Sequence, residues 1–309
     1  MSQIEVPPAW EQLPLESLSG VLMVIGAPDT GKSTFARYLY ARLCKGHERV
    51  AFVDGDVGQA SLGPPTTMTL VVRRRGETNF PPDGPCFRVF VGSNSPRGHM
   101  LPTVLGLYRL VCQARELGAT ATVVDTTGLV AAEQGGHILK HAKVDLLKPR
   151  VVFAIQRGRE LEHILVPLRR SARTRVVDLA AVPAVQPRDA VARRAHRAAA
   201  FRRYFADAAP LEVPWGQMAV FPAPVFSPGR LVALEDARGF ALALGVVLEM
   251  NATRRTVSLL TPARSLEGVD AIRLGDLWLD PATGEEQRRW DMGGVRRETG
   301  SGGREARGR

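Results

Sequence analysis

The most specific chemical signature in the chain is a phosphate-binding loop. Residues 26–33 read GAPDTGKS and fit the pattern GxxxxGK[ST], between an apolar run at 21–25 and a helix-length stretch at 33–44. A loop of this kind directs backbone N–H groups at phosphate oxygens, and the helix N-terminus behind it favours negative charge. Lys32 is expected to reach the β- and γ-phosphates, and Ser33 to bind Mg²⁺. The residues predicted to bind the nucleotide, taken to be ATP, are Gly26, Asp29, Thr30, Gly31, Lys32, Ser33 and Thr34.

Carboxylates follow two later apolar runs. Asp54 and Asp56, in the segment DGDVGQ, come after the run at 50–53, and Asp125, in DTTG, comes after the run at 120–124. The carboxyl ends of neighbouring parallel strands meet at one edge of a sheet, where ligands bind. These carboxylates are therefore predicted to lie where substrate and metal meet. The alternative is structural, because Asp side chains also cap backbone amides in turns.

An arginine-rich stretch is the fourth feature. Between residues 150 and 203 there are thirteen arginines and four acidic residues. Arg193, Arg194 and Arg197 follow helical spacing and are expected to share a surface. Such a helix is commonly just a solvated face, but the shortage of nearby acids to pair with these arginines favours an anionic partner.

The overall composition is compatible with that partner. The chain has 309 residues and a net charge of +10, which suits nucleic acid or an anionic membrane surface but also simply opposes aggregation. Its cysteines, Cys44, Cys86 and Cys112, form no CxxC pair, and the first residues lack the apolar segment of a signal peptide. No apolar run approaches the ~18 residues that span a bilayer. These features predict a cytoplasmic protein.

The order of apolar runs predicts the fold class. Apolar runs alternate with helix-length stretches, which favours an α/β fold of the P-loop NTPase type, a mostly parallel sheet covered by helices. After Pro210, short β-type runs separated by Gly, Pro and Asn turns predict a small C-terminal all-β domain. The expected strands of the first part are 21–25, 50–53, 87–91, 120–124, 151–155 and 175–179, and its expected helices include 33–44, 103–117 and 189–205.

In this order the pieces resemble the polynucleotide 5′-hydroxyl kinase family. That family includes the eukaryotic pre-mRNA cleavage and tRNA-splicing RNA kinase, the nucleolar rRNA-processing kinases, and shorter archaeal and bacterial members. The resemblance covers roughly residues 20–280. Besides the P-loop, DGDVGQ at 54–59 matches the family's DxDxGQ, FVGSNSP at 90–96 its FxGxxSP, and TTG at 126–128 its substrate clasp, TxGW. Residues 188–205 match its arginine lid, RSxxxRRxxR followed by IRxYF.

The resemblance implies a kinase that transfers the γ-phosphate of ATP, with Mg²⁺, to the 5′-hydroxyl end of RNA or DNA. In this scheme Asp56 orients or deprotonates the hydroxyl, and the lid arginines close over the phosphoryl group. The residues implied to be catalytic are Lys32, Asp56, Arg188 and Arg193. Those implied to bind the substrate are Gln59, Thr126, Thr127, Gly128 and Arg197. Those implied to hold the metal are Ser33, Asp56 and Asp125.

The sequence departs from the family pattern at two positions. Leu129 stands where the clasp has tryptophan, which removes the aromatic side chain that could stack on a substrate base. Asp189 stands where the lid has serine. Larger members also carry a domain ahead of the P-loop. In this sequence the P-loop begins at Gly26.

These implications divide the chain into four parts. They are an N-terminal extension at 1–19, a P-loop kinase domain at 20–210 with its lid at about 186–205, a small β domain at 211–290, and a disordered Gly- and Arg-rich tail at 291–309.

Two other functions stay open. One is a nucleotide-switch ATPase or GTPase, although no NKxD or TKxD motif for reading guanine is present. The other is a catalytically silent RNA-processing adaptor that keeps ATP bound, against which the intact Lys32, Asp56 and Arg193 argue. The sequence does not distinguish RNA from DNA as the acceptor.

Overall fold

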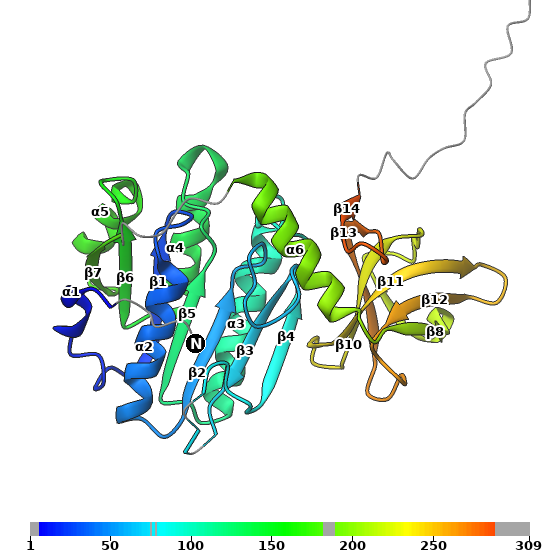
Figure 1. The fold of residues 1–309 in the computed structure, drawn as a ribbon, viewed down its shortest axis with the longest axis horizontal. Coiled ribbons are helices and arrows are strands. Elements are labelled where there is room, and N and C mark those ends of the chain that lie inside the picture. Colours follow the sequence, from blue (N-terminus) through cyan, green and yellow to red (C-terminus); the bar gives the residue numbers. More distant parts are fainter. Residues whose placement is uncertain (1–5, 75, 78, 182–188, 288–309) are drawn as a thin grey trace, which may run out of the picture.

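The first part of the chain forms a parallel-rich sheet (Figure 1). The computed structural model describes residues 6–74, 76–77, 79–181 and 189–287. The strand order is β4-β3-β2-β5-β1-β6-β7, and all neighbours run parallel except at β3, which is antiparallel to both β2 and β4. The strands are β1 (Gly20–Gly26), β2 (Val50–Gly55), β3 (Thr67–Val72), β4 (Cys86–Phe90), β5 (Ala121–Thr126), β6 (Val151–Gln156) and β7 (Arg175–Ala180). The predicted α/β fold is confirmed, but strand β3 was missed.

Helices cover both faces of this sheet. Along β1, Val21, Met23 and Ile25 join one apolar cluster, whereas Leu22 and Val24 join the other. This alternation follows from the pleat of a strand and places apolar side chains on both faces. On one face lie α1 (Pro8–Glu11) and α2 (Lys32–Gly46), and on the other α3 (Met100–Glu116), α4 (Gly136–Leu147) and α5 (Glu162–Arg170). Among the described residues, no helix has both the length and the apolar character needed to cross a bilayer.

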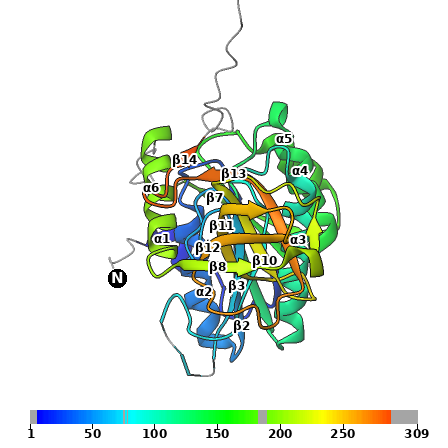
Figure 2. The same ribbon diagram turned by 90° about the vertical axis from the view of Figure 1, so that its right-hand side faces the viewer.

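The C-terminal part of the chain is all-β, as predicted, and its sheet faces the viewer in Figure 2. Its order is β14-β13-β10-β11-β12-β8, and β9 pairs with β13. Because β8 already starts at Ala209, we propose that the small β domain begins there rather than after residue 210. The expected tail at 291–309 lies outside the described residues. The strands are β8 (Ala209–Val213), β9 (Ala219–Phe221), β10 (Arg230–Glu235), β11 (Ala241–Asn251), β12 (Thr256–Thr261), β13 (Ala271–Leu279) and β14 (Glu286–Gln287).

Helix α6 (Ala190–Tyr204) connects the two parts (Figure 1). Its N-cap is Asp189, whose side chain accepts a hydrogen bond of 2.7 Å from Ala192 N–H. Serine and aspartate both serve as N-caps, which accounts for the exchange at this position. At the far end, Phe201 and Phe205 are buried in a cluster shared with the second sheet. The aromatic end of α6 is therefore anchored, and its arginine end lies near the first sheet.

Candidate active site

Segments from five parts of the chain line one cleft of about 760 Å³. They are the P-loop after β1, the turn after β2, residues 94–97 after β4, the turn after β5, and one side of α6. The carboxyl ends of β1, β2 and β5 meet here because these strands are parallel neighbours. Of the predicted site residues, those that line the cleft are Asp29, Gly31, Lys32, Ser33, Thr34, Asp56, Gln59, Thr127, Gly128, Arg193 and Arg197.

The P-loop lysine points back into its own loop. Lys32 is almost fully buried, and its Nζ donates a hydrogen bond of 2.6 Å to the Ala27 carbonyl. Burial lowers the pKa of Lys32, although the nearby Asp125 and Asp56 act in the opposite direction. Thr30 also donates to the Ala27 carbonyl, at 3.0 Å, so this predicted ATP-binding residue shapes the loop from beneath.

The clasp turn packs directly on the P-loop. A Cβ atom at Gly128 would lie 2.9–3.1 Å from three atoms of Pro28. Real Cβ atoms essentially never come closer than 3.0 Å to another atom, and 3.0–3.1 Å is tighter than most of their contacts, so glycine favours this close approach. The P-loop and the clasp therefore form adjacent walls of the cleft.

The two aspartates after β2 have different surroundings. Asp54 is buried, and its Oδ2 accepts hydrogen bonds from Ser61 N–H (2.5 Å), Ser61 Oγ (3.0 Å) and Leu62 N–H (3.0 Å). Asp54 therefore has the structural role considered above, because it binds the backbone amides that close the loop after β2. Asp56 lines the cleft, while its Oδ1 accepts from the N–H groups of Gly58 and Gln59 at 3.0 and 3.1 Å. These bonds fix the Asp56 carboxylate at the cleft wall.

Asp125 lies under the cleft beside Ser33. Burial, with a contribution from Asp54, raises the pKa of Asp125 to about 7, against a hydrogen bond from Ser33. Its Oδ1 is buried and lacks a hydrogen-bond partner within the described part of the chain. A carboxylate oxygen and a hydroxyl at a phosphate site are the donors that Mg²⁺ uses together with phosphate and water. These residues therefore fit the ion.

Of the two clasp threonines predicted to bind substrate, only Thr127 lines the cleft. Thr126 was predicted to bind substrate, but it is fully buried, and its Oγ1 donates to the Val24 carbonyl at 2.8 Å. The same oxygen accepts a hydrogen bond of 2.8 Å from Lys140 Nζ. That prediction is corrected for the side chain, because the only hydrogen of the Thr126 hydroxyl is already donated to Val24 and Thr126 does not line the cleft. Thr127 lines the cleft instead, and its Oγ1 has no partner among the residues described.

The lid arginines pair with acids that are distant in sequence. Arg193 Nη2 lies 2.6 Å from Asp29 Oδ2 of the P-loop. Arg197 makes a two-pronged contact with Glu286, one arm of which measures 3.2 Å. The shortage of nearby acids in the sequence therefore does not leave Arg193 or Arg197 without an acidic partner. The predicted catalytic Arg188 lies outside the described residues.

Two lysines on α4 were missed by the sequence analysis. Lys140 and Lys143 are both fully buried. Burial, with the neighbouring Lys143 adding to it, holds the pKa of Lys140 well below its ordinary value, and burial lowers that of Lys143 to about 8. The available signal was their spacing of three on the apolar side of a helix, next to Leu139 and Val144.

The chain matches one family model across this whole site. Residues 26–207 match the model described as the mRNA cleavage and polyadenylation factor CLP1 P-loop. The chain belongs to this family. The matched span holds the P-loop, both carboxylate turns and α6, and it stops just before the second sheet.

Several relatives of this CLP1 P-loop chain have names that describe an activity. It is 34% identical over 152 residues to "Polyribonucleotide 5′-hydroxyl-kinase MJ1315" of Methanocaldococcus jannaschii, which is 49% of this chain and 41% of that protein. It is 27% identical over 318 residues to "Polyribonucleotide 5′-hydroxyl-kinase TK1956" of Thermococcus kodakarensis, 82% of this chain and 86% of that protein. Except for the latter, the chain spans well under half the length of the relatives it matches.

A solved structure shares the fold. The structure of the wild-type Clp1p–Pcf11p complex superposes with a TM-score of 0.64 over 87% of this chain and 77% of that one, at 13% identity. At this identity the similarity concerns the fold alone.

Proposed function

We propose that the protein is an ATP-dependent polynucleotide 5′-hydroxyl kinase, which transfers the γ-phosphate of ATP to the 5′-hydroxyl end of RNA or DNA. The observation that carries the proposal is that the P-loop, Asp56, Thr127 and Arg193 face one cleft. The names of the relatives, found in a shared family, support the same reaction.

The nucleotide half of the cleft would hold ATP and Mg²⁺. Phosphoryl transfer depends on positioning and on stabilising negative charge, with little covalent chemistry by the protein. The P-loop backbone and Lys32 hold the phosphates, and Ser33 with Asp125 holds Mg²⁺. The bound ion neutralises charge on the phosphate oxygens.

The acceptor half of the cleft would hold the 5′ end. Asp56 is the carboxylate on its wall, and it accepts or orients the proton of the attacking hydroxyl. Thr127 and Gly128 hold the 5′ end of the polynucleotide against the P-loop. Gln59 lines the same wall, with its Nε2 donating to the Gly58 carbonyl at 2.7 Å.

The lid would supply a cation next to both substrates, ATP and the 5′-hydroxyl end. An ion pair with Asp29 holds Arg193 against the P-loop, and the Arg193 side chain is about one third exposed. In this proposal its guanidinium stabilises charge on the transferred group, as an arginine finger does. Arg197 lines the cleft one turn away, and its charge is already matched by Glu286.

The test is transfer of label. Purified protein is incubated with γ-labelled ATP, Mg²⁺ and 5′-hydroxyl oligonucleotides of RNA and of DNA, and label is followed on the oligonucleotide and as free phosphate. We expect label on the oligonucleotide, and a loss of at least ~10²-fold in Lys32→Ala because a cation at the developing charge is removed. Release of free phosphate alone would favour a nucleotide switch, and ATP binding without turnover a silent adaptor.

A further inference from the structure

One buried amine under the clasp makes specific contacts that no sequence motif foretold. Lys140 Nζ donates to Thr126 Oγ1 at 2.8 Å and to the Thr127 carbonyl at 2.5 Å. Removing an ammonium group from water costs several kcal/mol unless it gains good hydrogen bonds. The contacts of Lys140 supply such bonds, and both go to the turn that forms the acceptor wall.

The close approach of α4 brings Lys140 to this position. A Cβ atom at Gly136, the first residue of the helix, would lie 2.4–2.7 Å from backbone atoms of Val130. Glycine therefore lets the helix start against the segment that follows the clasp. His163 on α5 also contacts this segment, with its Nε2 2.8 Å from the Val130 carbonyl.

The amine joins three elements at the centre of the site. Thr126 Oγ1 donates onward to the Val24 carbonyl of β1, the strand that leads into the P-loop. Lys140 thus ties α4 to the end of β5 and, through Thr126, to β1. With Thr126 held in this way, the next side chain, Thr127, is the one that lines the cleft.

Lys143 provides an internal contrast. It lies one turn further along α4 and is also fully buried. Its Nζ has no hydrogen-bond partner within the described ranges. The two lysines therefore share burial and helix but differ in contact with the clasp.

We propose that Lys140 is a positioning residue for phosphoryl transfer, which fixes the clasp turn at residues 126–128 so that Thr127 and Gly128 meet the acceptor strand. The inference rests on the proposed kinase function. Lys140 acts through the clasp and does not itself touch substrate.

The experiment compares Lys140→Met with Lys143→Met. Methionine is close to lysine in volume and removes the amine. In Lys140→Met we expect single-turnover transfer at saturating ATP to fall by about 10–100-fold, as for misplacement of a reacting group. Its Kd for ATP should stay within about twofold of wild type by the same reasoning. Lys143→Met should transfer at close to the wild-type rate, although both variants lose a buried amine.

A second pair of variants covers the case in which Lys140→Met does not fold. Thr126→Val removes the oxygen that Lys140 binds, and Thr126→Ser keeps it. We expect slow transfer in Thr126→Val and near-normal transfer in Thr126→Ser, and no further loss when Thr126→Val is combined with Lys140→Met. A thermal unfolding curve for each variant separates lost fold from lost positioning.

The outcomes separate the two proposals. If wild type transfers label but Lys140→Met matches it, or if both lysine variants lose the same activity, the role of Lys140 is overturned while the kinase function stands. Equal rates in Thr126→Val and Thr126→Ser would overturn it as well. No transfer by wild type would overturn both.

Discussion

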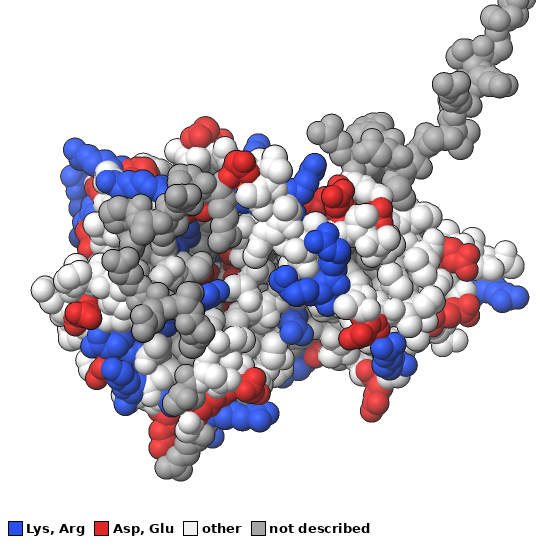
Figure 3. Space-filling view, in the orientation of Figure 1, with Lys and Arg blue, Asp and Glu red and all other residues white. Residues whose placement is uncertain are grey.

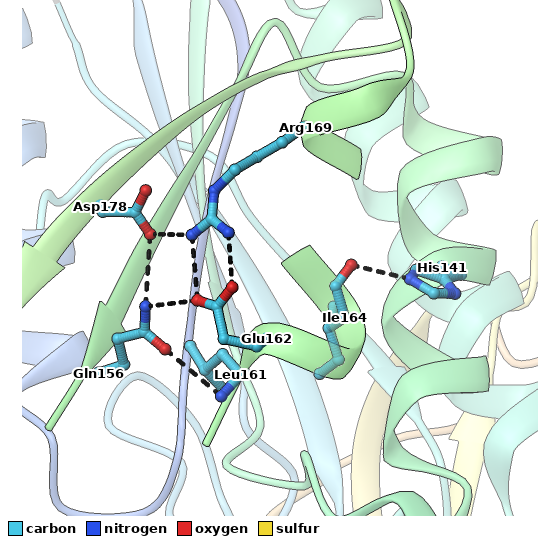
Figure 4. A network of polar contacts seen from close by, with 7 residues as sticks. All are labelled: His141, Gln156, Leu161, Glu162, Ile164, Arg169 and Asp178. Atoms are coloured by element: carbon cyan, nitrogen blue, oxygen red, sulfur yellow. Dashed lines mark hydrogen bonds and ion pairs between the residues drawn. The ribbon is translucent and has the colours of Figure 1, made fainter. Parts of the chain in front are cut away.

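Two arginine-rich regions of this chain look alike in sequence and differ in the structure. At the α5–β7 end, Arg169 lies between Glu162 and Asp178, with contacts of 2.8 and 2.6 Å, and Gln156 completes the network (Figure 4). These acids are 7 and 9 residues away from Arg169. In the space-filling view, basic side chains also gather over α6, in the middle of the face shown (Figure 3).

The acids that pair with the arginines of α6 are much more distant in sequence. Asp29 lies 164 residues from Arg193, and Glu286 lies 89 residues from Arg197. A pair within one α/β unit fixes that unit. The Arg193–Asp29 pair joins α6 to the P-loop, and both residues line the cleft, so this pair can separate when a charged substrate enters. Charge density alone therefore does not distinguish the two regions, whereas the sequence distance to the acidic partners does, and we propose that the arginines of α6 are the functional ones.

The largest expected effect is from Arg193→Ala. Loss of this guanidinium should slow single-turnover transfer by about 10³-fold, the lower end of the range for an arginine finger. The Kd for ATP should change far less. Arg197→Ala is the control and should lose less, since the partner of Arg197, Glu286, does not line the cleft, whereas Asp29, the partner of Arg193, does. A defect of Arg193→Ala confined to ATP binding would remove the distinction between the two regions.

A smaller effect is expected in the salt dependence of oligonucleotide binding. Arg203 is exposed and lines the cleft, whereas Arg170 is exposed on α5, away from it. If nucleic acid follows α6, Arg203→Ala should reduce the slope of log K against log salt by about 1, and Arg170→Ala should leave it unchanged. Binding measured by fluorescence anisotropy over a salt series checks this. Identical slopes in both variants would place no phosphate contact at Arg203.

The smallest effect on activity is expected for Arg169→Ala, which should transfer label like wild type. Hydrogen bonds from Arg169 and then Gln156 hold the pKa of Glu162 at about 2, below its ordinary value of 4.5. A carboxyl with a lowered folded-state pKa stabilises the fold above its unfolded pKa, and this stabilisation disappears as the pH falls through the folded value. Arg169→Ala should therefore show a lower Tm than wild type at pH 7, and the difference should shrink between pH 4.5 and pH 2. A constant difference across that range would mean that the Glu162 pair contributes nothing to stability.

The sequence predicted the parts of the site that are local along the chain. The P-loop, the turn at Asp56 and the helix at 189–205 follow from short motifs and helical spacing. Strand β3 escaped because Thr67 and Thr69 interrupt it, so TMTLVV at 67–72 lacks the continuous apolar run that marked the other strands. Its antiparallel direction depends on the neighbouring strands.

The rest depends on packing that sequence spacing does not encode. Thr126 and Thr127 are adjacent at a strand end, where successive side chains point to opposite sides, so the motif alone cannot assign which threonine lines the cleft. In the sequence Lys140 resembles any charged residue on a helix, because its contact with the clasp depends on how α4 packs. Glu286 lies 89 residues from Arg197, outside the arginine-rich stretch at 150–203.

The most direct test of this account is single-turnover transfer by Arg193→Lys and Arg169→Lys, measured side by side with γ-labelled ATP and a 5′-hydroxyl oligonucleotide. Lysine keeps the charge but loses the planar fork of donors. The account predicts that Arg193→Lys is slower than wild type by at least about tenfold, since a fork at the transferred phosphoryl group is replaced by a point charge. Arg169→Lys should match wild type. Wild-type transfer by Arg193→Lys, or equal loss in both variants, would contradict the assignment of α6 as the catalytic lid.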